Sequence, residues 1–546
     1  MERKKQMQKA VKKETFVQGI VALLFSQVII KLLGLVYKLY LTNREGFGDA
    51  GNAIYGSGYQ IYALLLTLSS IGVPGAIAKL ISEKAAVGDN RGAHRIFKIS
   101  LVTFGLIGLF GTCVMFFGAR YISTVLLQIP EAELTMVALA PAIFFVAIAS
   151  VIRGYFNGMH SMKATANSQT LEQVFKTFLT LLIVEIIAIF SKADTTLMAA
   201  GATIATTLAT FLSFGYLCLY YRSMKKNVWN NLKESTPEKK ESIKKVLKSI
   251  MIVSIPVTIT ALLSSVNKNI DAFTVVRGLK TFIADEARAK ELYGIISGKV
   301  DTLTTLPLSF NVAFSTALLP AVASAIARKD KKVASEKISF TILATILLGL
   351  PATIGMIVFA EPILKLLFPM QPDGALVLQV TSLTIIAVAL VQTINAALQG
   401  IGRVNVPAIA LTIGVIVKFI CNTTLVPNPQ FGILGAAIGS VLCYVVADLI
   451  AFIVLKKSIK IDTKLTKFVI KPLLACAIMG IISYGLYINI INVIGAKIAT
   501  IISLGVAVII YGLSIAVLKI LTKDEILMLP MGNKIYKLLN KFKIYN

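Results

Sequence analysis

Long stretches of apolar residues recur along the chain from Phe16 to Ile520, separated by short polar segments. Each stretch is long enough to cross a hydrocarbon core, which requires about 20 helical residues. The stretches are continuous, whereas the strands of an outer-membrane barrel alternate apolar and polar residues over about ten positions. The pattern therefore predicts an all-α integral membrane protein.

The boundaries of the apolar stretches predict about 14 transmembrane helices. Polar and basic segments separate them at regular intervals, so consecutive helices should cross the membrane in opposite directions. The predicted spans are residues 15–41, 58–82, 96–118, 132–156, 170–191, 196–221, 247–276, 291–327, 338–360, 374–398, 404–425, 432–455, 466–490 and 496–520.

Composition and charge agree with this prediction. Hydrophobic residues make up 56% of the chain and charged residues 15%, and the mean hydropathy is +0.79. A soluble protein has about 45–50% apolar and about 25% charged residues. The net charge of +28 could suggest nucleic acid, but most lysines and arginines collect in alternate loops, as on a cytoplasmic face. We therefore expect a cytoplasmic-membrane protein with both termini in the cytoplasm and no nucleic-acid partner.

The order of the spans suggests two pseudo-symmetric lobes of six helices followed by two further helices. We expect an N-terminal lobe over residues 1–224, a basic cytoplasmic linker over 225–245 and a C-terminal lobe over 246–460. The last two spans occupy 461–521, and a basic amphipathic tail follows over 522–546.

A spacing repeated across the linker indicates an internal duplication. Gly158 at the end of the fourth span is followed 18 residues later by Lys176, and Gly400 at the end of the tenth span is followed at the same distance by Lys418. Parallel repeats of this kind place a transported substrate between two related lobes.

No pattern of metal-binding or catalytic residues stands out. The five cysteines lack CxxC spacing, and His94 and His160 both fall in expected loops. The extracytoplasmic loops are short and carry no paired acids beside a histidine, as an enzyme of this kind would need. The sequence therefore predicts no metal, no cofactor and no enzymatic activity.

Charged residues inside the first span mark the main candidate site. Gln27, Lys31, Gly34 and Lys38 follow a 4-3-4 spacing, which places them along one face of a helix. Charges inside a membrane are costly and therefore suggest function. Two lysines on one face suit an anion such as a phosphate, and Gly34 would leave room for a bulky headgroup. A lysine pairing with an acid on another helix remains the alternative.

Polar residues in later spans are further candidates. Asn267, Lys268 and Asp271 form a polar stripe on the seventh span, where Asp271 could bind a coupling ion. Lys299 on the eighth span could help to hold a phosphate, although a polar seam between helices explains these residues as well. Glu172 and Lys176 are one helical turn apart and are predicted to pair.

The segment from Ile152 to Gln173 resembles polysaccharide-export flippases of Gram-positive bacteria. It contains the run Arg153-Gly-Tyr-Phe-Asn-Gly158 and continues to Glu172. These flippases comprise the stage V sporulation protein B group and its MurJ-like relatives in the multidrug/oligosaccharidyl-lipid/polysaccharide (MOP) superfamily. The likeness covers essentially the whole chain, including Lys31-Leu-Leu-Gly34 in the first span.

The resemblance implies a V-shaped transporter with alternating access and a cargo linked to undecaprenyl pyrophosphate. Basic residues of a central cavity would hold the pyrophosphate, and a groove of the last two helices would take the lipid tail. Lys31 matches the first of two family arginines on the first helix, whereas the second falls at Tyr37, beside Lys38. On the eighth helix, the basic position near Thr302 is displaced to Lys299. Arg153, Gly158, Glu172 and Lys176 would then be structural residues of the family.

Three functions fit the sequence. The first is a flippase for a lipid-linked glycan such as lipid II, in cell-wall synthesis or sporulation. The second is a cation-coupled multidrug exporter of the same architecture, and the third is a non-transporting membrane scaffold for cell-wall or spore assembly. The expected partners are the lipid-linked glycan, membrane lipids and cell-wall synthesis proteins, and a monomer is the simplest functional unit.

Overall fold

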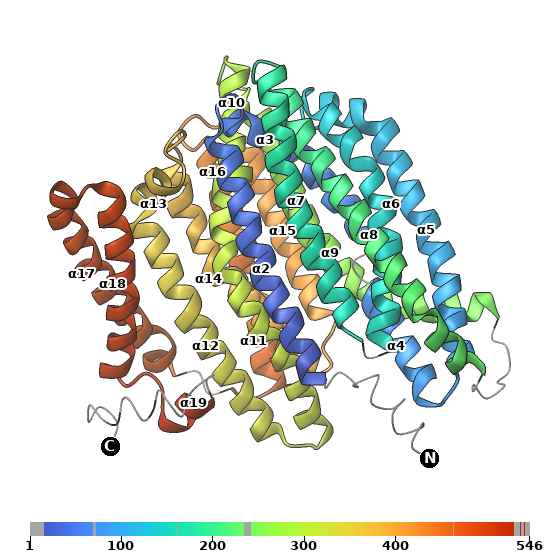
Figure 1. Ribbon diagram of the computed structural model, residues 1–546. Coiled ribbons are helices and arrows are strands. Elements are labelled where there is room, and N and C mark those ends of the chain that lie inside the picture. Colours follow the sequence, from blue (N-terminus) through green and yellow to red (C-terminus); the bar gives the residue numbers. More distant parts are fainter. Residues whose placement is uncertain are drawn as a thin grey trace. The chain divides into compact units, whose positions relative to one another are not determined.

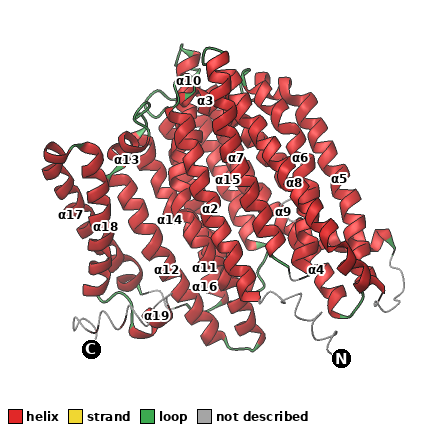
Figure 2. Ribbon diagram, viewed as in Figure 1, coloured by secondary structure: helices red, strands yellow, loops and turns green. Residues whose placement is uncertain are grey.

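The computed structural model describes residues 16–68, 73–159, 161–233, 242–461 and 464–528, together with Tyr536 and Asn540. Within these residues the regular structure consists of helices alone, with no strand (Figure 2). This confirms the predicted all-α class. The chain divides into two compact units, one ending at Phe273 and the other beginning at Thr274.

The first unit is built around helix α6, which has the largest buried share of any candidate span. Helices α3, α4, α5 and α8 all pack against α6, and α7 packs against both α2 and α8. The helices of this unit are α2 (Phe16–Asn43), α3 (Gly48–Leu66), α4 (Val73–Ala86), α5 (Asn90–Tyr121), the π-helical turn η2 (Ile122–Leu126), α6 (Ala132–Gly158), α7 (Lys163–Phe190), α8 (Thr195–Lys233) and α9 (Ile243–Leu279), whose last residues enter the second unit (Figure 1).

In the second unit, α14 packs against α11, α12 and α16, and α15 packs along α16. The last two long helices, α17 and α18, lie side by side (Figure 1). The helices of this unit are α10 (Glu286–Gly294), the π-helical turn η3 (Ile295–Val300), α11 (Asp301–Ala327), α12 (Lys331–Val358), α13 (Ala360–Leu367), α14 (Ala375–Gly400), α15 (Val406–Leu425), α16 (Ile433–Ser458), the π-helical turn η4 (Thr466–Ile470), α17 (Lys471–Ile494), α18 (Ala496–Val517) and α19 (Lys523–Met528).

Eleven helices in the described part of the chain are long and apolar enough to cross a membrane. Each coincides with one of the 14 predicted spans. The three other predicted spans overlap α2, the α3–α4 pair and α9. The short helix α13 was not predicted, because its eight residues are too few to produce a recognisable apolar stretch.

The predicted domain boundaries stay a prediction. The division between the two compact units falls inside α9, whereas the sequence places it in the linker over 225–245. Residues 234–241 of that linker lie outside the described part of the chain, and so does most of the predicted tail over 522–546.

A close helix contact recurs at the two glycines that the duplication pairs. A Cβ atom on Gly158, the last residue of α6, would lie 2.8 Å from the carbonyl oxygen of Ala78 in α4. A Cβ atom on Gly400, the last residue of α14, would lie 3.1 Å from the carbonyl oxygen of Leu319 in α11 and 2.9 Å from the Val322 side chain. Both contacts need a residue without a side chain, which agrees with the predicted duplication.

Candidate functional site

Two buried lysines lie against three tyrosine rings in the first unit. The ammonium nitrogen of Lys176, which is 7% exposed, lies 5.1 Å from the ring centre of Tyr37 and 4.6 Å from that of Tyr59. The ammonium nitrogen of Lys38, which is 5% exposed, lies 4.9 Å from the ring centre of Tyr55. We call Tyr37, Lys38, Tyr55, Tyr59 and Lys176 the tyrosine–lysine cluster.

The packing of α2 against α7 positions this cluster. The Thr177 hydroxyl of α7 donates a hydrogen bond to the Leu33 carbonyl oxygen of α2, at 3.4 Å. A Cβ atom on Gly34 would lie 3.8 Å from Nε2 of Gln173, an ordinary contact distance. The two helices therefore approach closely one turn before the cluster, which brings the lysine of α7 beside the tyrosine of α2.

Helix α3 supplies the other two rings of the cluster. Tyr55 and Tyr59 are four residues apart, so their side chains share one face of α3. Their rings stack with centroids 5.7 Å apart. Because the two rings stack, they hold their aromatic faces in place beside the two ammonium groups. Such faces attract cations.

No carboxylate oxygen of the described residues lies within the 4 Å ion-pair distance of the Lys176 ammonium. The predicted pair between Glu172 and Lys176 is therefore wrong. Glu172 instead accepts a hydrogen bond from Nη2 of Arg153 in α6, at 2.8 Å. Arginine competes well for a carboxylate because its planar guanidinium offers several donors in a fixed geometry.

Arg153 connects three helices of the first unit. Besides Glu172, its guanidinium donates to the hydroxyl of Ser168 in α7 at 2.9 Å and to that of Ser213 in α8 at 3.0 Å. The Ser213 hydroxyl in turn donates to the Ser168 carbonyl oxygen at 2.9 Å. Arg153 is 8% exposed, so nearly all of its charge is compensated inside the protein. This geometry fits the structural role predicted for Arg153 and Glu172, which stays a prediction.

The cluster leaves positive charge in a buried place. Burying an ammonium group costs several kcal/mol, whereas a cation–π contact returns only about 0.5–2 kcal/mol. The aromatic faces therefore reduce the cost of the Lys176 charge without cancelling it. An anion would gain more from this position than any neutral or cationic ligand.

The other candidates on α2 lie before the cluster. Lys31 is exposed and precedes Lys38 by seven residues, or about 10 Å along the helix. Gln27 lies within α2, but its side chain is outside the described part of the structure. Gly34 lies between the two lysines and faces α7. Its predicted role in making room for a headgroup stays a prediction.

The candidates of the later spans lie apart from α2 in the sequence. On α9, Asn267 and Asp271 are buried, and Lys268 is partly exposed. Lys299 is fully buried in the π-helical turn η3, where its ammonium group donates a hydrogen bond to the Gln371 carbonyl oxygen at 2.7 Å. Their functional roles therefore stay predictions.

No group of three metal-ligating side chains was found among the described residues. The predicted loop residue His160 is outside them. The three tyrosines of the cluster were missed by sequence reasoning. The four-residue spacing of Tyr55 and Tyr59 was a usable signal, but the sequence does not show that Lys176 of α7 lies against them.

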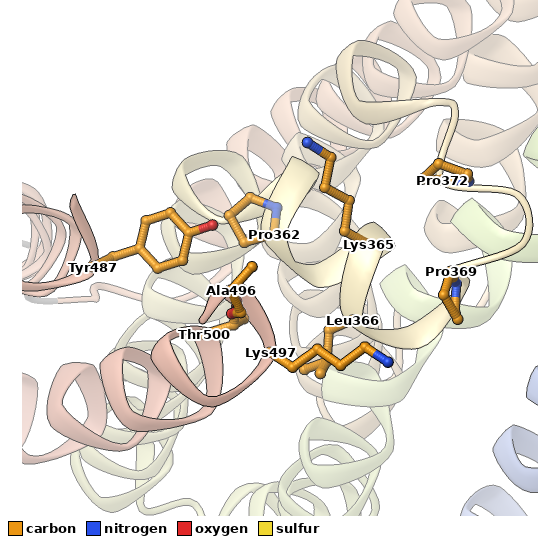
Figure 3. A pocket seen from close by; sticks show the side chains of 9 residues that line it. All are labelled: Pro362, Lys365, Leu366, Pro369, Pro372, Tyr487, Ala496, Lys497 and Thr500. Atoms are coloured by element: carbon orange, nitrogen blue, oxygen red, sulfur yellow. The ribbon is translucent and has the colours of Figure 1, made fainter. Parts of the chain in front are cut away.

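A separate cavity of about 270 Å³ lies in the second unit, between α13 and the ends of α17 and α18 that meet at Gly495 (Figure 3). The Glu361 carboxylate, 2.6 Å from the Lys365 ammonium, raises the pKa of Lys365. The lining residues are Pro362, Lys365, Leu366, Pro369, Pro372, Tyr487, Ala496, Lys497 and Thr500.

Long apolar helices in two compact units, with buried lysines in both of them, are typical of a multi-pass membrane transporter. The chain belongs to the polysaccharide biosynthesis protein family, whose family model matches residues 16–326. A second model, described as MatE, matches residues 298–424.

Similar proteins agree with this assignment. The chain is 26% identical to stage V sporulation protein B of Bacillus subtilis over 95% of this chain and 98% of that protein. It is 25% identical to lipid II flippase MurJ of the same organism over 85% and 87%. A solved inward closed structure of lipid II flippase MurJ has the same fold, with a TM-score of 0.65 at 15% identity over 91% and 98%. The chain therefore shares its family with these proteins and its fold with solved transporters of the MOP superfamily, as the resemblance implied.

Proposed function

We propose that this protein is a flippase that moves an undecaprenyl-pyrophosphate-linked glycan precursor, lipid II or a related cell-wall intermediate, from the inner to the outer leaflet. The observation that carries this proposal is the buried ammonium group of Lys176, which has tyrosine rings around it and no carboxylate within ion-pair distance in the described residues. A negatively charged headgroup is the natural partner for such a group. The name of the MurJ relative supports lipid II as one cargo of this chemistry.

In this proposal Lys176 and Lys38 attract the pyrophosphate, and Lys31 forms the first contact two turns earlier on α2. Lysine serves phosphate as a point charge, and it needs no fixed orientation of the ligand. Gln27 and Gly34 border this path. Lys299 contributes from the second unit in a state of the cycle in which it leaves the Gln371 carbonyl oxygen.

Alternating access then carries the headgroup across the membrane. An inside-negative potential favours outward movement of an anion by about 2.3 kcal/mol per charge per 100 mV. Asn267, Lys268 and Asp271 on α9 are proposed to bind a coupling ion. The α17–α18 pair is proposed to hold the lipid tail, since its outward side chains are large and apolar.

The proposal places the protein in the bacterial cytoplasmic membrane with both termini in the cytoplasm. In this orientation, the basic loops meet the anionic inner leaflet. The lipid-linked glycan and membrane lipids are then its partners, and cell-wall synthesis proteins act before and after it.

The test is translocation of fluorescent lipid II by the purified protein in vesicles, with and without an imposed voltage. Wild-type protein should move the lipid, and Lys176→Gln should reduce the rate at least tenfold. Lys365→Gln is the control, because this exposed lysine lies outside the cluster. Full activity of Lys176→Gln would contradict the assignment.

The match of residues 298–424 to the MatE model favours a multidrug exporter as the second candidate. In that case the same vesicles would extrude a cationic dye and leave the lipid in place. A buried cationic cluster argues against this outcome, since it repels a cationic drug.

A further inference from the structure

An acidic residue lies near the middle of the most apolar candidate span. Helix α16 has a mean hydropathy of 2.5, the highest of the 11 spans found among the described residues. Asp448 is its sole acidic residue and the sixteenth of its 26 residues. It lies about 15 Å from the nearer end of the helix, so it cannot reach the polar headgroup region with its short side chain.

The carboxyl group of Asp448 has no protein partner in the described residues. Its Oδ1 atom is shielded from solvent and makes no hydrogen bond, while the residue as a whole is partly buried. No lysine, arginine or histidine nitrogen of those residues lies within ion-pair distance of it. In the helix turns on either side, Ala447 and Ala451 are buried in the apolar core of the second unit.

The neighbouring helices offer no compensating charge. Helix α14, which packs against α16, contains no ionisable residue, and α15 contains Lys418 and Cys421. The Lys418 side chain lies next to Gly439, nine residues or about 13 Å from Asp448 along α16. On α16 itself, Cys443 and Tyr444 precede Asp448, and Lys456 and Lys457 lie in the last turn.

We propose that Asp448 binds and releases one proton during the transport cycle. An ionised carboxyl group without a partner is strongly disfavoured in an apolar environment, so the neutral acid is the form that fits this conformation. When another conformation admits water to α16, the carboxyl group releases its proton to that water and becomes a carboxylate. Proton binding then favours the conformation that shields Asp448, because the shielded site accepts the neutral acid and not the carboxylate.

This inference rests on the protein being a transporter, and it does not depend on the cargo under "Proposed function". It supplies the second unit with a coupling ion of its own. Asp271 on α9 is the coupling candidate of the sequence, and it belongs to the first unit, whereas Asp448 belongs to the second. The two sites can therefore be tested separately.

The first test asks whether Asp448 carries a proton at neutral pH. Dicyclohexylcarbodiimide is an apolar reagent that modifies protonated carboxyl groups, and mass spectrometry of the full-length protein in lipid vesicles locates the modified peptide. We expect modification at Asp448 in the wild type and at least tenfold less on the same peptide in Asp448→Asn. The matched control Glu361→Gln, which removes an exposed and ion-paired acid, should leave the modification unchanged. Absence of the reagent from Asp448 at neutral pH would overturn the proposal.

The second test measures conformation without any cargo. Spin labels on cysteines introduced at the exposed positions Val125 and Gln430 report the distance between the two units in a background without native cysteines. Between about pH 5 and about pH 9, the distance distribution should shift in the wild type and in Asp448→Glu, but not in Asp448→Asn. The same shift in Asp448→Asn, or no shift in the wild type, would contradict proton coupling. Failure of lipid II transport alone would instead contradict the proposed cargo.

Discussion

At the scale of single residues, Lys176 and Arg153 are two buried cations with different surroundings. The ammonium group of Lys176 lies over the rings of Tyr37 and Tyr59. Arg153, in contrast, has bonds to a carboxylate and two hydroxyls. One buried cation is therefore bonded to a carboxylate, and the other has no carboxylate within ion-pair distance in the described residues.

The charge of Lys176 should lower stability while it supports transport. Lys176→Met replaces a buried ammonium group without an acid partner by an apolar chain of similar length. We expect the unfolding free energy of this variant to rise by about 1 kcal/mol or more, so that it unfolds at a higher temperature. We also expect the variant to lose transport. Thermal unfolding of the purified protein and the lipid translocation assay measure the two effects. A variant that is less stable than the wild type would show that the lysine is structural.

Arg153 should behave in the opposite way. Arg153→Ala leaves Glu172 as a partly buried carboxylate without its guanidinium, so we expect a loss of about 3–5 kcal/mol of unfolding free energy. The double variant Arg153→Ala/Glu172→Ala should recover part of that loss, because it removes the stranded charge. Unfolding of both variants in detergent checks this, and equal stability of the single and double variants would contradict the pairing.

The sequence shows which charged residues fall inside the predicted spans but not which groups they contact. Glu172 and Lys176 are one turn apart, and a pair at that spacing contributes only about 0.2–0.5 kcal/mol. Glu172 pairs instead with Arg153 of another helix. The tyrosines that contact Lys176 come from α2 and α3. Apolar patterns fix which residues share a helix face. They do not determine against which face of another helix these residues pack.

At the scale of elements, the spans were predictable and the local departures from them were not. Each of the 11 candidate spans matches a predicted span, because a hydrocarbon core demands a long apolar helix. The π-helical turn η3 breaks the regularity of one such span and places Lys299 against the Gln371 carbonyl oxygen. The loop before α14 is thus tied to the span, and this depends on backbone geometry that the apolar pattern does not encode.

Gly374 fixes the start of α14 and should not tolerate a side chain. Its φ angle is +107°, and a Cβ atom there would lie 2.5 Å from Cγ2 of Ile295 in η3. We expect Gly374→Ala to lower the unfolding free energy by about 1–3 kcal/mol. Gly355→Ala in α12 is the matched control, because nothing lies within 4 Å of its Cβ position. Thermal unfolding compares the two variants, and equal midpoints would contradict this reading of the loop.

At the scale of the whole molecule, the proposed cargo makes transport sensitive to voltage. The headgroup carries negative charge and the lysines of the cluster carry positive charge, so their sum determines the response. We expect an inside-negative potential to accelerate outward movement. The potential contributes at most about 2.3 kcal/mol per net charge per 100 mV, and this energy limits the increase in rate. Rates in vesicles with imposed potassium gradients measure this, and a rate independent of voltage would mean that the loaded site is electrically neutral.

The glycine contacts at the ends of α6 and α14 have a consequence for the history of the chain. In each unit, only the hydrogen atom of a glycine fits between the end of one helix and the backbone of another helix. A shared requirement this strict, at matching places of both halves, is most simply inherited. On the predicted duplication, a gene encoding one half would already have needed glycine there before it was copied and joined to itself.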